Sequence, residues 1–127
     1  VTQNEFEEIH KFVVEKLRKY RERSKIIRET SREASYLFND GILDFVYIDA
    51  NHSYEACKED LEIWWPKLRE NGIFAGHDYL KGKLSTGTYG VKKAVDEFVA
   101  KYKQRLYVTH EKDWPVWYFI KNTSETE

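Results

Sequence analysis

The chain contains, at residues 43–55, the stretch Leu43-Asp44-Phe45-Val46-Tyr47-Ile48-Asp49-Ala50-Asn51-His52-Ser53-Tyr54-Glu55. An apolar run typical of a buried strand ends in an acid, and a short polar turn with a histidine precedes a helical pattern. The same order recurs at Gly72-Ile73-Phe74-Ala75-Gly76-His77-Asp78-Tyr79. Open α/β sheets bind ligands at the carboxyl ends of their strands. The two stretches therefore predict a site at which two strand ends each deliver an imidazole and a carboxylate.

The rest of the chain alternates helical and strand patterns, which predicts a layered α/β fold with a mostly parallel sheet. The last two predicted strands have no helix between them, so we expect an antiparallel hairpin at one edge. The glycine- and serine-rich segment Lys81–Gly90 predicts a mobile loop. The expected helices are Asn4–Arg21, a short one after Thr30-Ser31, Tyr54–Leu68 and Val91–Tyr102. Pro66 is expected to interrupt the last turn of the third of these helices. The expected strands are Lys25–Arg28, Leu43–Asp49, Ile73–Ala75, Leu106–His110 and Val116–Lys121.

Composition narrows the class of protein. The 127 residues suit one domain, residues 1–127, and the net charge of -1 gives no general field for nucleic acid or anionic membranes. The single cysteine, Cys57, excludes an intrachain disulfide and favours a reducing, cytoplasmic compartment with the thiol buried and inert. The chain begins at Val1 and has no methionine. We therefore expect a piece of a longer reading frame, truncated on its N-terminal side.

Four motifs in order resemble class I S-adenosylmethionine-dependent methyltransferases, in the branch that carries I-D-x-x-H-S-Y-E and G-H-D-Y. They are Ile48-Asp49-Ala50-Asn51-His52-Ser53-Tyr54-Glu55, Asp60-Leu61-Glu62-Ile63-Trp64, Asn71-Gly72-Ile73-Phe74-Ala75-Gly76-His77-Asp78-Tyr79 and Gly90-Val91-Lys92-Lys93-Ala94-Val95-Asp96-Glu97-Phe98. The resemblance covers about residues 4–121, the C-terminal two-thirds of the family's domain. It implies a three-layer, Rossmann-like sheet and O-methylation of a small-molecule or sugar-like acceptor.

The chain departs from the family in its first part. The family's cofactor site begins with a strand and a glycine-rich turn, whereas no glycine precedes Gly41 here. The first two strands of the family's sheet are therefore expected to be absent. This leaves three outcomes: Lys25–Arg28 pairs directly with the next strand, a second copy or another chain completes the sheet, or the remainder lies elsewhere. We favour the first two because unpaired inner strand edges invite pairing.

The resemblance also implies catalytic, cofactor-binding and metal-binding roles for individual residues. His77, His52 and Asp78 are the candidate catalytic group, since methyl transfer to oxygen needs a base and imidazole titrates near neutral pH. A structural role for His52, either in capping the following helix or in pairing with a carboxylate, is the alternative. Asp49, Ala50, Thr30 and Ser31 match cofactor-binding positions for S-adenosylmethionine, although Thr30 and Ser31 are also typical of an ordinary helix start. Asp49 and Asp78 match the acids that hold Mg²⁺ in metal-dependent relatives, and Asn51 is the remaining oxygen ligand nearby.

Two other functions stay open on the sequence. One is a non-catalytic interaction module that kept the framework and lost the cofactor. The other is a metal hydrolase using Asp49, His52, His77 and Asp78, which needs four converging ligands. We expect the isolated chain to be weakly active or inactive, with a small-molecule acceptor and no nucleic-acid or membrane partner. Tyr79 and Tyr89 are expected to line the acceptor pocket beneath the Lys81–Gly90 loop.

Overall fold

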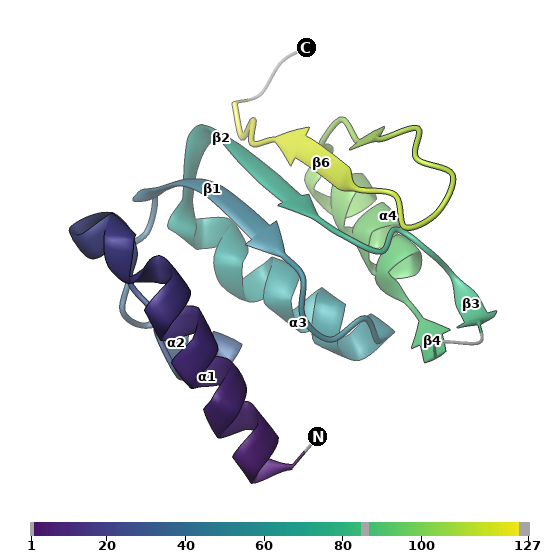
Figure 1. Ribbon diagram of the computed structural model, residues 1–127. Coiled ribbons are helices and arrows are strands. Elements are labelled where there is room, and N and C mark those ends of the chain that lie inside the picture. Colours follow the sequence, from purple (N-terminus) through teal and green to yellow (C-terminus); the bar gives the residue numbers. More distant parts are fainter. Residues whose placement is uncertain (1, 85–86, 125–127) are drawn as a thin grey trace. The chain divides into compact units, whose positions relative to one another are not determined.

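The computed structural model describes residues 2–84 and 87–124 (Figure 1). The chain divides into two compact units, residues 1–30 and residues 31–127, which are described separately. None of the described helices combines the length and apolar character that a membrane crossing requires.

The first unit is built on helix α1, Gln3–Leu17, followed by the short 3₁₀ helix η1, Arg18–Arg23. Thr2 caps α1: its hydroxyl accepts from the Glu5 N–H at 3.1 Å, and the Glu5 carboxylate accepts from the Thr2 N–H at 3.3 Å. This reciprocal pairing satisfies two of the backbone donors that a helix start leaves open. No residue of α1 is buried.

The predicted strand at Lys25–Arg28 is wrong, because the structure gives this segment no strand pairing. Its two isoleucines are flanked by charged residues, and Arg28 instead binds the Glu7 carboxylate at 2.6 Å. A strand is stable only beside a neighbour that takes up its backbone hydrogen bonds. The direct-pairing outcome is therefore not realised: among the described strands, β1, Leu43–Ile48, is bonded to β2 alone.

The second unit contains a mixed four-stranded sheet with the order β1-β2-β6-β5, where β2 is Leu68–Gly76, β5 is Tyr107–Val108 and β6 is Trp117–Ile120. β1 and β2 run parallel, and their register pairs Phe45 with Ile73 and Ile48 with Gly76. β6 runs antiparallel to both β2 and β5, so the predicted C-terminal hairpin lies at one edge. Only one pair of described strands in this sheet, β1 and β2, is parallel, whereas a mostly parallel sheet is predicted. The reason is that no described strand extends the sheet beyond β1.

Two helices, α3 (Tyr54–Trp64) and α4 (Val91–Tyr102), pack on one face of this sheet (Figure 1). The short helix α2, Ser31–Ser35, precedes β1. Alternate strand residues face these helices, so a single core forms between the layers. Its fully buried side chains include Leu61, Leu68, Phe74, Val95, Trp117 and Phe119.

The opposite face of the sheet is apolar but open. Phe45, Tyr47, Ile73 and Ile120 are each more than one-third exposed, and the rings of Phe45 and Tyr47 stack 6.3 Å apart. The second unit thus supplies two of the three predicted layers.

The boundaries of several elements differ from the prediction. α3 ends at Trp64 and passes into a 3₁₀ turn, η2, Trp65–Lys67, because Pro66 has no N–H to continue the helix. β2 is longer than expected, with Asn71 taking a left-handed φ of 66° inside it. The predicted loop at Lys81–Gly90 contains a two-stranded hairpin, β3 (Gly82–Leu84) and β4 (Gly87–Tyr89); Ser85 and Thr86 lie outside the described residues.

Lys121 is a buried residue whose hydrogen bonds should contribute measurably to the free energy of unfolding. Its side chain is buried, and its ammonium donates at 2.8 Å to the backbone carbonyls of Trp65 and Leu68. Lys121→Met would remove the lysine donor from both carbonyls, of which that of Trp65 keeps the N–H of Leu68 as a partner. We therefore expect a loss of about 2 kcal/mol in the free energy of unfolding by urea titration. Lys101→Met, which removes an exposed ion pair with Glu62, should change it little.

The same variant should alter the pH dependence of stability. Burial lowers the pKa of the Lys121 ammonium from its ordinary value of 10.5. Between the lowered pKa and 10.5 the unfolded chain binds more protons than the folded one, so this group makes stability rise with pH in that window. The Lys121→Met variant should lack this rise. Parallel pH profiles of the variant and the wild type would refute a depressed lysine pKa.

Candidate functional site

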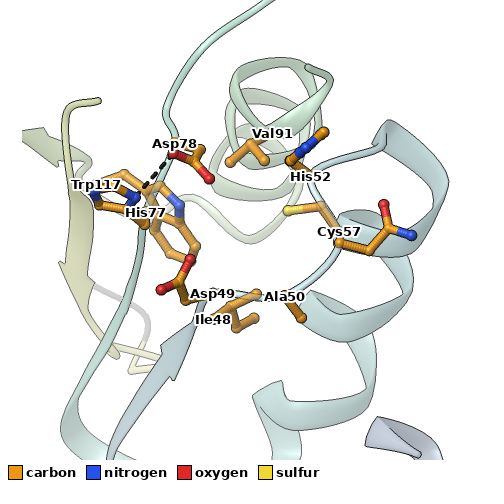
Figure 2. A pocket seen from close by; sticks show the side chains of 10 residues that line it. Ile48, Asp49, Ala50, His52, Cys57, His77, Asp78, Val91 and Trp117 are labelled. Carbon is orange, nitrogen blue, oxygen red and sulfur yellow. Dashed lines mark ion pairs between the residues drawn. The ribbon is translucent and has the colours of Figure 1, made fainter. Parts of the chain in front are cut away.

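The parallel pairing of β1 and β2 brings three predicted site residues together. Ile48 pairs with Gly76 at the ends of the two strands, and the Ile48 carbonyl accepts the N–H of His77 at 3.2 Å. The next side chains along the two strands are Asp49 and the pair His77 and Asp78. Ligand atoms of these three residues all lie within 4.8 Å of one another (Figure 2). The predicted juxtaposition of the two strand ends is confirmed.

Asp78 is held in an unusual backbone conformation. Its φ is 58°, in the left-handed region, which costs a residue with a side chain about 1 kcal/mol. The Asp78 carboxylate lies 2.9 Å from Nδ1 of His77, and both side chains are about two-thirds or more buried. The strained turn and the ion pair together fix the direction of the imidazole. Strain of this kind is commonly found at functional sites.

These side chains surround a small cavity. Its volume is about 10 Å³, which is room for about one water molecule. Polar groups from both strand ends and from the start of α3 line it, together with the buried thiol of Cys57. The lining residues are Ile48, Asp49, Ala50, Asn51, His52, Cys57, His77, Asp78, Val91 and Trp117.

Cys57 is a structural residue of this cavity. Burial raises the pKa of its thiol to about 12, so the nucleophilic thiolate is not populated near neutral pH. The sequence-based prediction of a buried, inert thiol is confirmed.

His52 and Asn51 also reach the cavity, but both make other interactions. The His52 ring stacks on Tyr89, with centroids 4.2 Å apart, and its carbonyl accepts the N–H of Gly90 at 2.9 Å. The Asn51 side-chain oxygen accepts the Ser53 N–H at 2.9 Å, and Ser53 is the residue that caps α3. The helix-capping alternative for His52 is therefore wrong, and the Asn51 oxygen is already engaged in shaping the turn.

Ser31 lies away from the cavity. Its hydroxyl accepts from the indole N–H of Trp64 at 2.7 Å, at the C-terminal end of α3. Ser53 marks the other end of this 11-residue helix, roughly 16 Å away at 1.5 Å per residue. Ser31 also hydrogen-bonds Asp60, where burial raises the pKa of the carboxyl group. Thr30 ends the first unit, so its cofactor role, like that of Ser31, remains a prediction.

A larger cavity of about 580 Å³ lies between α3, the β3–β4 hairpin and α4. Tyr89 lines it, as predicted for the acceptor side, whereas Tyr79 is outside the lining. The Tyr79 hydroxyl donates instead to Asp96 at 2.5 Å, and burial, aided by this bond, raises the pKa of Tyr79. The lining residues are Ser53, Tyr54, Glu55, Lys81, Gly82, Tyr89, Gly90, Lys92, Lys93, Asp96 and Glu97.

Two features of the site are absent from the sequence-based prediction. Trp117 is the first residue of the apolar strand β6, where its aromatic neighbours hide any functional signal. Tyr89 is predicted for the acceptor pocket, but its contact with His52 is not, because the hairpin that presents it has no apolar alternation. Both residues reach the site through tertiary packing, for which the local sequence carries no periodic pattern.

Comparison with solved structures supports the fold. A Corynebacterium glutamicum protein superposes with a TM-score of 0.70 at 13% identity, covering 98% of this chain and 60% of that one. A Staphylococcus aureus protein, provisionally named a caffeoyl-CoA O-methyltransferase, superposes with a TM-score of 0.69 at 17% identity, covering 91% and 61%. The chain thus spans about three-fifths of these relatives. A search of curated proteins returned no match.

The family comparison is more direct. The family model described as "Methyltransferase domain" matches residues 1–79, which include α1, β1, α3, β2 and the three clustered site residues. That is more than half of the chain. The chain therefore belongs to this methyltransferase domain family, with the Rossmann-like α/β fold of class I methyltransferases.

Proposed function

We propose that the chain is the acceptor-side part of an S-adenosylmethionine-dependent O-methyltransferase acting on a small hydroxyl-bearing or sugar-like molecule. The observation that supports this most is the cluster of Asp49, His77 and Asp78 at adjacent strand ends, with ligand atoms within 4.8 Å. In an open α/β sheet this is where ligands bind. The neighbouring cavity of about 580 Å³ offers the room that a small acceptor needs.

His77 is proposed as the base. Nδ1 of His77 lies 2.9 Å from the Asp78 carboxylate, which leaves Nε2 to accept the proton of an acceptor hydroxyl. The Asp78 carboxylate would stabilise the imidazolium that forms. His52, whose ring stacks on that of Tyr89, is the second candidate.

Asp49 and Ala50 are proposed to hold the adenosyl part of the cofactor, which supplies the methyl group when bound. A carboxylate at a strand end is suited to binding hydroxyl groups, and the Asp49 side chain is exposed. Thr30 and Ser31 are cofactor-binding candidates through the resemblance alone. Because no glycine precedes Gly41, this chain offers no glycine-rich turn for the rest of the cofactor. We therefore expect weak binding and slow turnover by the chain alone.

The same cluster fits a divalent cation. Two carboxylates and one imidazole provide three converging ligand atoms, and carboxylate oxygens suit Mg²⁺. The imidazole nitrogen would make the site at least as suitable for Mn²⁺. Asp49 and Asp78 would hold the ion, which would align the acceptor hydroxyl and lower its pKa.

A non-catalytic interaction module is the second candidate. It is favoured by one observation, the lack of any glycine in the first 40 residues. A cytoplasmic location is proposed for either function from the single free thiol of Cys57.

Radiolabelled methyl transfer separates these two functions. The chain is incubated with S-adenosylmethionine carrying a labelled methyl group and a panel of small phenols, catechols and sugars, with and without Mg²⁺. The proposal expects labelled product for at least one hydroxyl-bearing acceptor. Label transfer to none of them, by a chain shown to be folded, would favour the interaction module.

The free edge of β1 leads to a proposal about assembly. In the parallel pair, the Ile48 carbonyl points to β2, so the backbone groups of Phe45 and Tyr47 point outward, where no described strand pairs with them. We propose that a second copy completes the sheet by antiparallel pairing about Val46. Phe45 of one copy then lies opposite Tyr47 of the other, and Asp44 opposite Ile48, so no like charges meet.

Light scattering after gel filtration tests this assembly. The wild-type chain should elute as a dimer, and Tyr47→Lys should convert it to a monomer, because edge lysines block strand pairing. Tyr36→Lys, at an exposed tyrosine after α2, should leave the dimer intact. A wild-type monomer at tens of micromolar would contradict the proposal.

A further inference from the structure

One buried polar group of the site has no partner. Trp117 is 0% exposed, and its indole Nε1–H is the only buried side-chain nitrogen or oxygen, among the residues described, that makes no hydrogen bond. Nearly all buried donors in folded proteins are paired, because an unpaired one loses its bond to water without replacement. A lone exception therefore calls for an explanation.

Packing prevents the indole from turning to find a protein partner. Trp117 pairs with Gly76 across the antiparallel ladder, and its ring rests directly on that glycine: an added Cβ there would lie 2.4 Å from Trp117 Cζ2. The rings of Phe74 and Phe119 hold it from the sides, with centroids 5.9 and 5.8 Å away. The direction of the N–H bond is thus fixed by the core.

That direction leads into the cavity at the strand ends. Trp117 lines it together with Asp49, His77 and Asp78, and Figure 2 shows the indole beside these side chains, facing the space between them. The cavity of about 10 Å³ has room for one oxygen atom the size of water. A fixed donor, two carboxylates and an imidazole around such a space make a site for a single hydroxyl oxygen.

We propose that Trp117 Nε1–H binds the oxygen of the acceptor's reacting hydroxyl, and that one water takes this place when no acceptor is present. The role in the reaction rests on the proposed function. As the hydroxyl gives its proton to the base, negative charge develops on its oxygen, and a hydrogen bond to a fixed, buried donor strengthens. Trp117 would therefore favour the deprotonated acceptor and fix its distance from His77.

The first test does not depend on activity. A crystal structure of the 127-residue chain at about 1.5 Å should show an oxygen peak within about 2.7–3.2 Å of Trp117 Nε1. Trp117→Phe keeps most of the ring but removes the donor, and should lose the peak. Trp65→Phe, in the same core but outside the cavity, should keep it. An empty cavity in the wild type, or a retained peak in Trp117→Phe, would overturn the proposal.

The second test addresses the reaction and guards against a variant that fails to fold. Wild-type chain with ¹⁵N-labelled tryptophan should show a cross peak between one indole N–H and a bound water by nuclear Overhauser spectroscopy; its absence would also overturn the proposal.

In methyl transfer, Trp117→Phe should lower kcat about tenfold while leaving the affinity for S-adenosylhomocysteine unchanged. A chain that holds the water yet never transfers methyl groups would refute the proposed function and leave the oxygen site standing.

Discussion

Asp49→Asn is expected to reduce methyl transfer about 100-fold or more while leaving the fold intact. Asp49 is an exposed side chain at a strand end, so its replacement by an isosteric amide should not disturb the core. It lies with His77 and Asp78 in a cluster whose ligand atoms are within 4.8 Å. Removing one of the three converging ligand groups would weaken cofactor and cation binding together. Rate losses of this order are typical when a positioned charged group is removed from an active site.

Asp44→Asn is the matched control. Asp44 belongs to the same strand, is exposed, and binds Arg69 at 2.7 Å at the opposite end of β1. Its amide variant should keep the wild-type rate in the labelled methyl-transfer assay. Equal losses in the two variants would mean that the effect is a general one of charge, and would argue against a site at Asp49.

Gly76→Ala should destabilise the fold by about 3 kcal/mol. The added Cβ would lie 2.4 Å from Cζ2 of Trp117 and 2.7 Å from the Ile48 carbonyl oxygen. Neither can move cheaply, because Trp117 is 0% exposed and the carbonyl belongs to the β1–β2 ladder. Overpacking of a close-packed core typically costs about 1–3 kcal/mol, and here both obstructing atoms are rigid. Urea unfolding followed by tryptophan fluorescence measures the loss.

Gly41→Ala is the control for the backbone cost of replacing a glycine by alanine at a site where the added Cβ is not crowded. Nothing lies within 4 Å of a Cβ at Gly41, but its φ of 69° is unfavourable for alanine. We expect a cost of about 1 kcal/mol from the backbone alone. If the two variants lose the same stability, the close approach of Trp117 to Gly76 does not determine the effect.

The sequence predicts best the features of the fold that depend on residues close to one another along the chain. The apolar runs before Asp49 and before His77 predict two strands, and the carboxyl ends of neighbouring parallel strands necessarily lie at the same edge of the sheet. The start of α3 at Tyr54 and the extent of α4, Val91–Tyr102, are also predicted as observed. These features depend on local hydrogen bonding and on helical or strand periodicity, both of which a single sequence records.

Features that depend on a partner elsewhere are not predictable in this way. Lys25–Arg28 has strand composition but forms no strand, because pairing needs a neighbour that composition does not reveal. Ser31 has the position of a helix cap, yet its hydroxyl binds Trp64, which is distant along the chain. Trp117 lies in a strand of core residues, and only the three-dimensional packing shows that its N–H faces the site. Local sequence contains no trace of these contacts.

Titration calorimetry with S-adenosylhomocysteine, in the presence and absence of Mg²⁺, tests most directly whether the strand-end cluster is a methyltransferase site. We predict micromolar binding to the wild-type chain that is weakened at least about tenfold by Asp49→Asn and unchanged by Asp44→Asn. Binding of the metal ion without any binding of the nucleoside, or equal nucleoside affinity in all three proteins, would contradict the assignment.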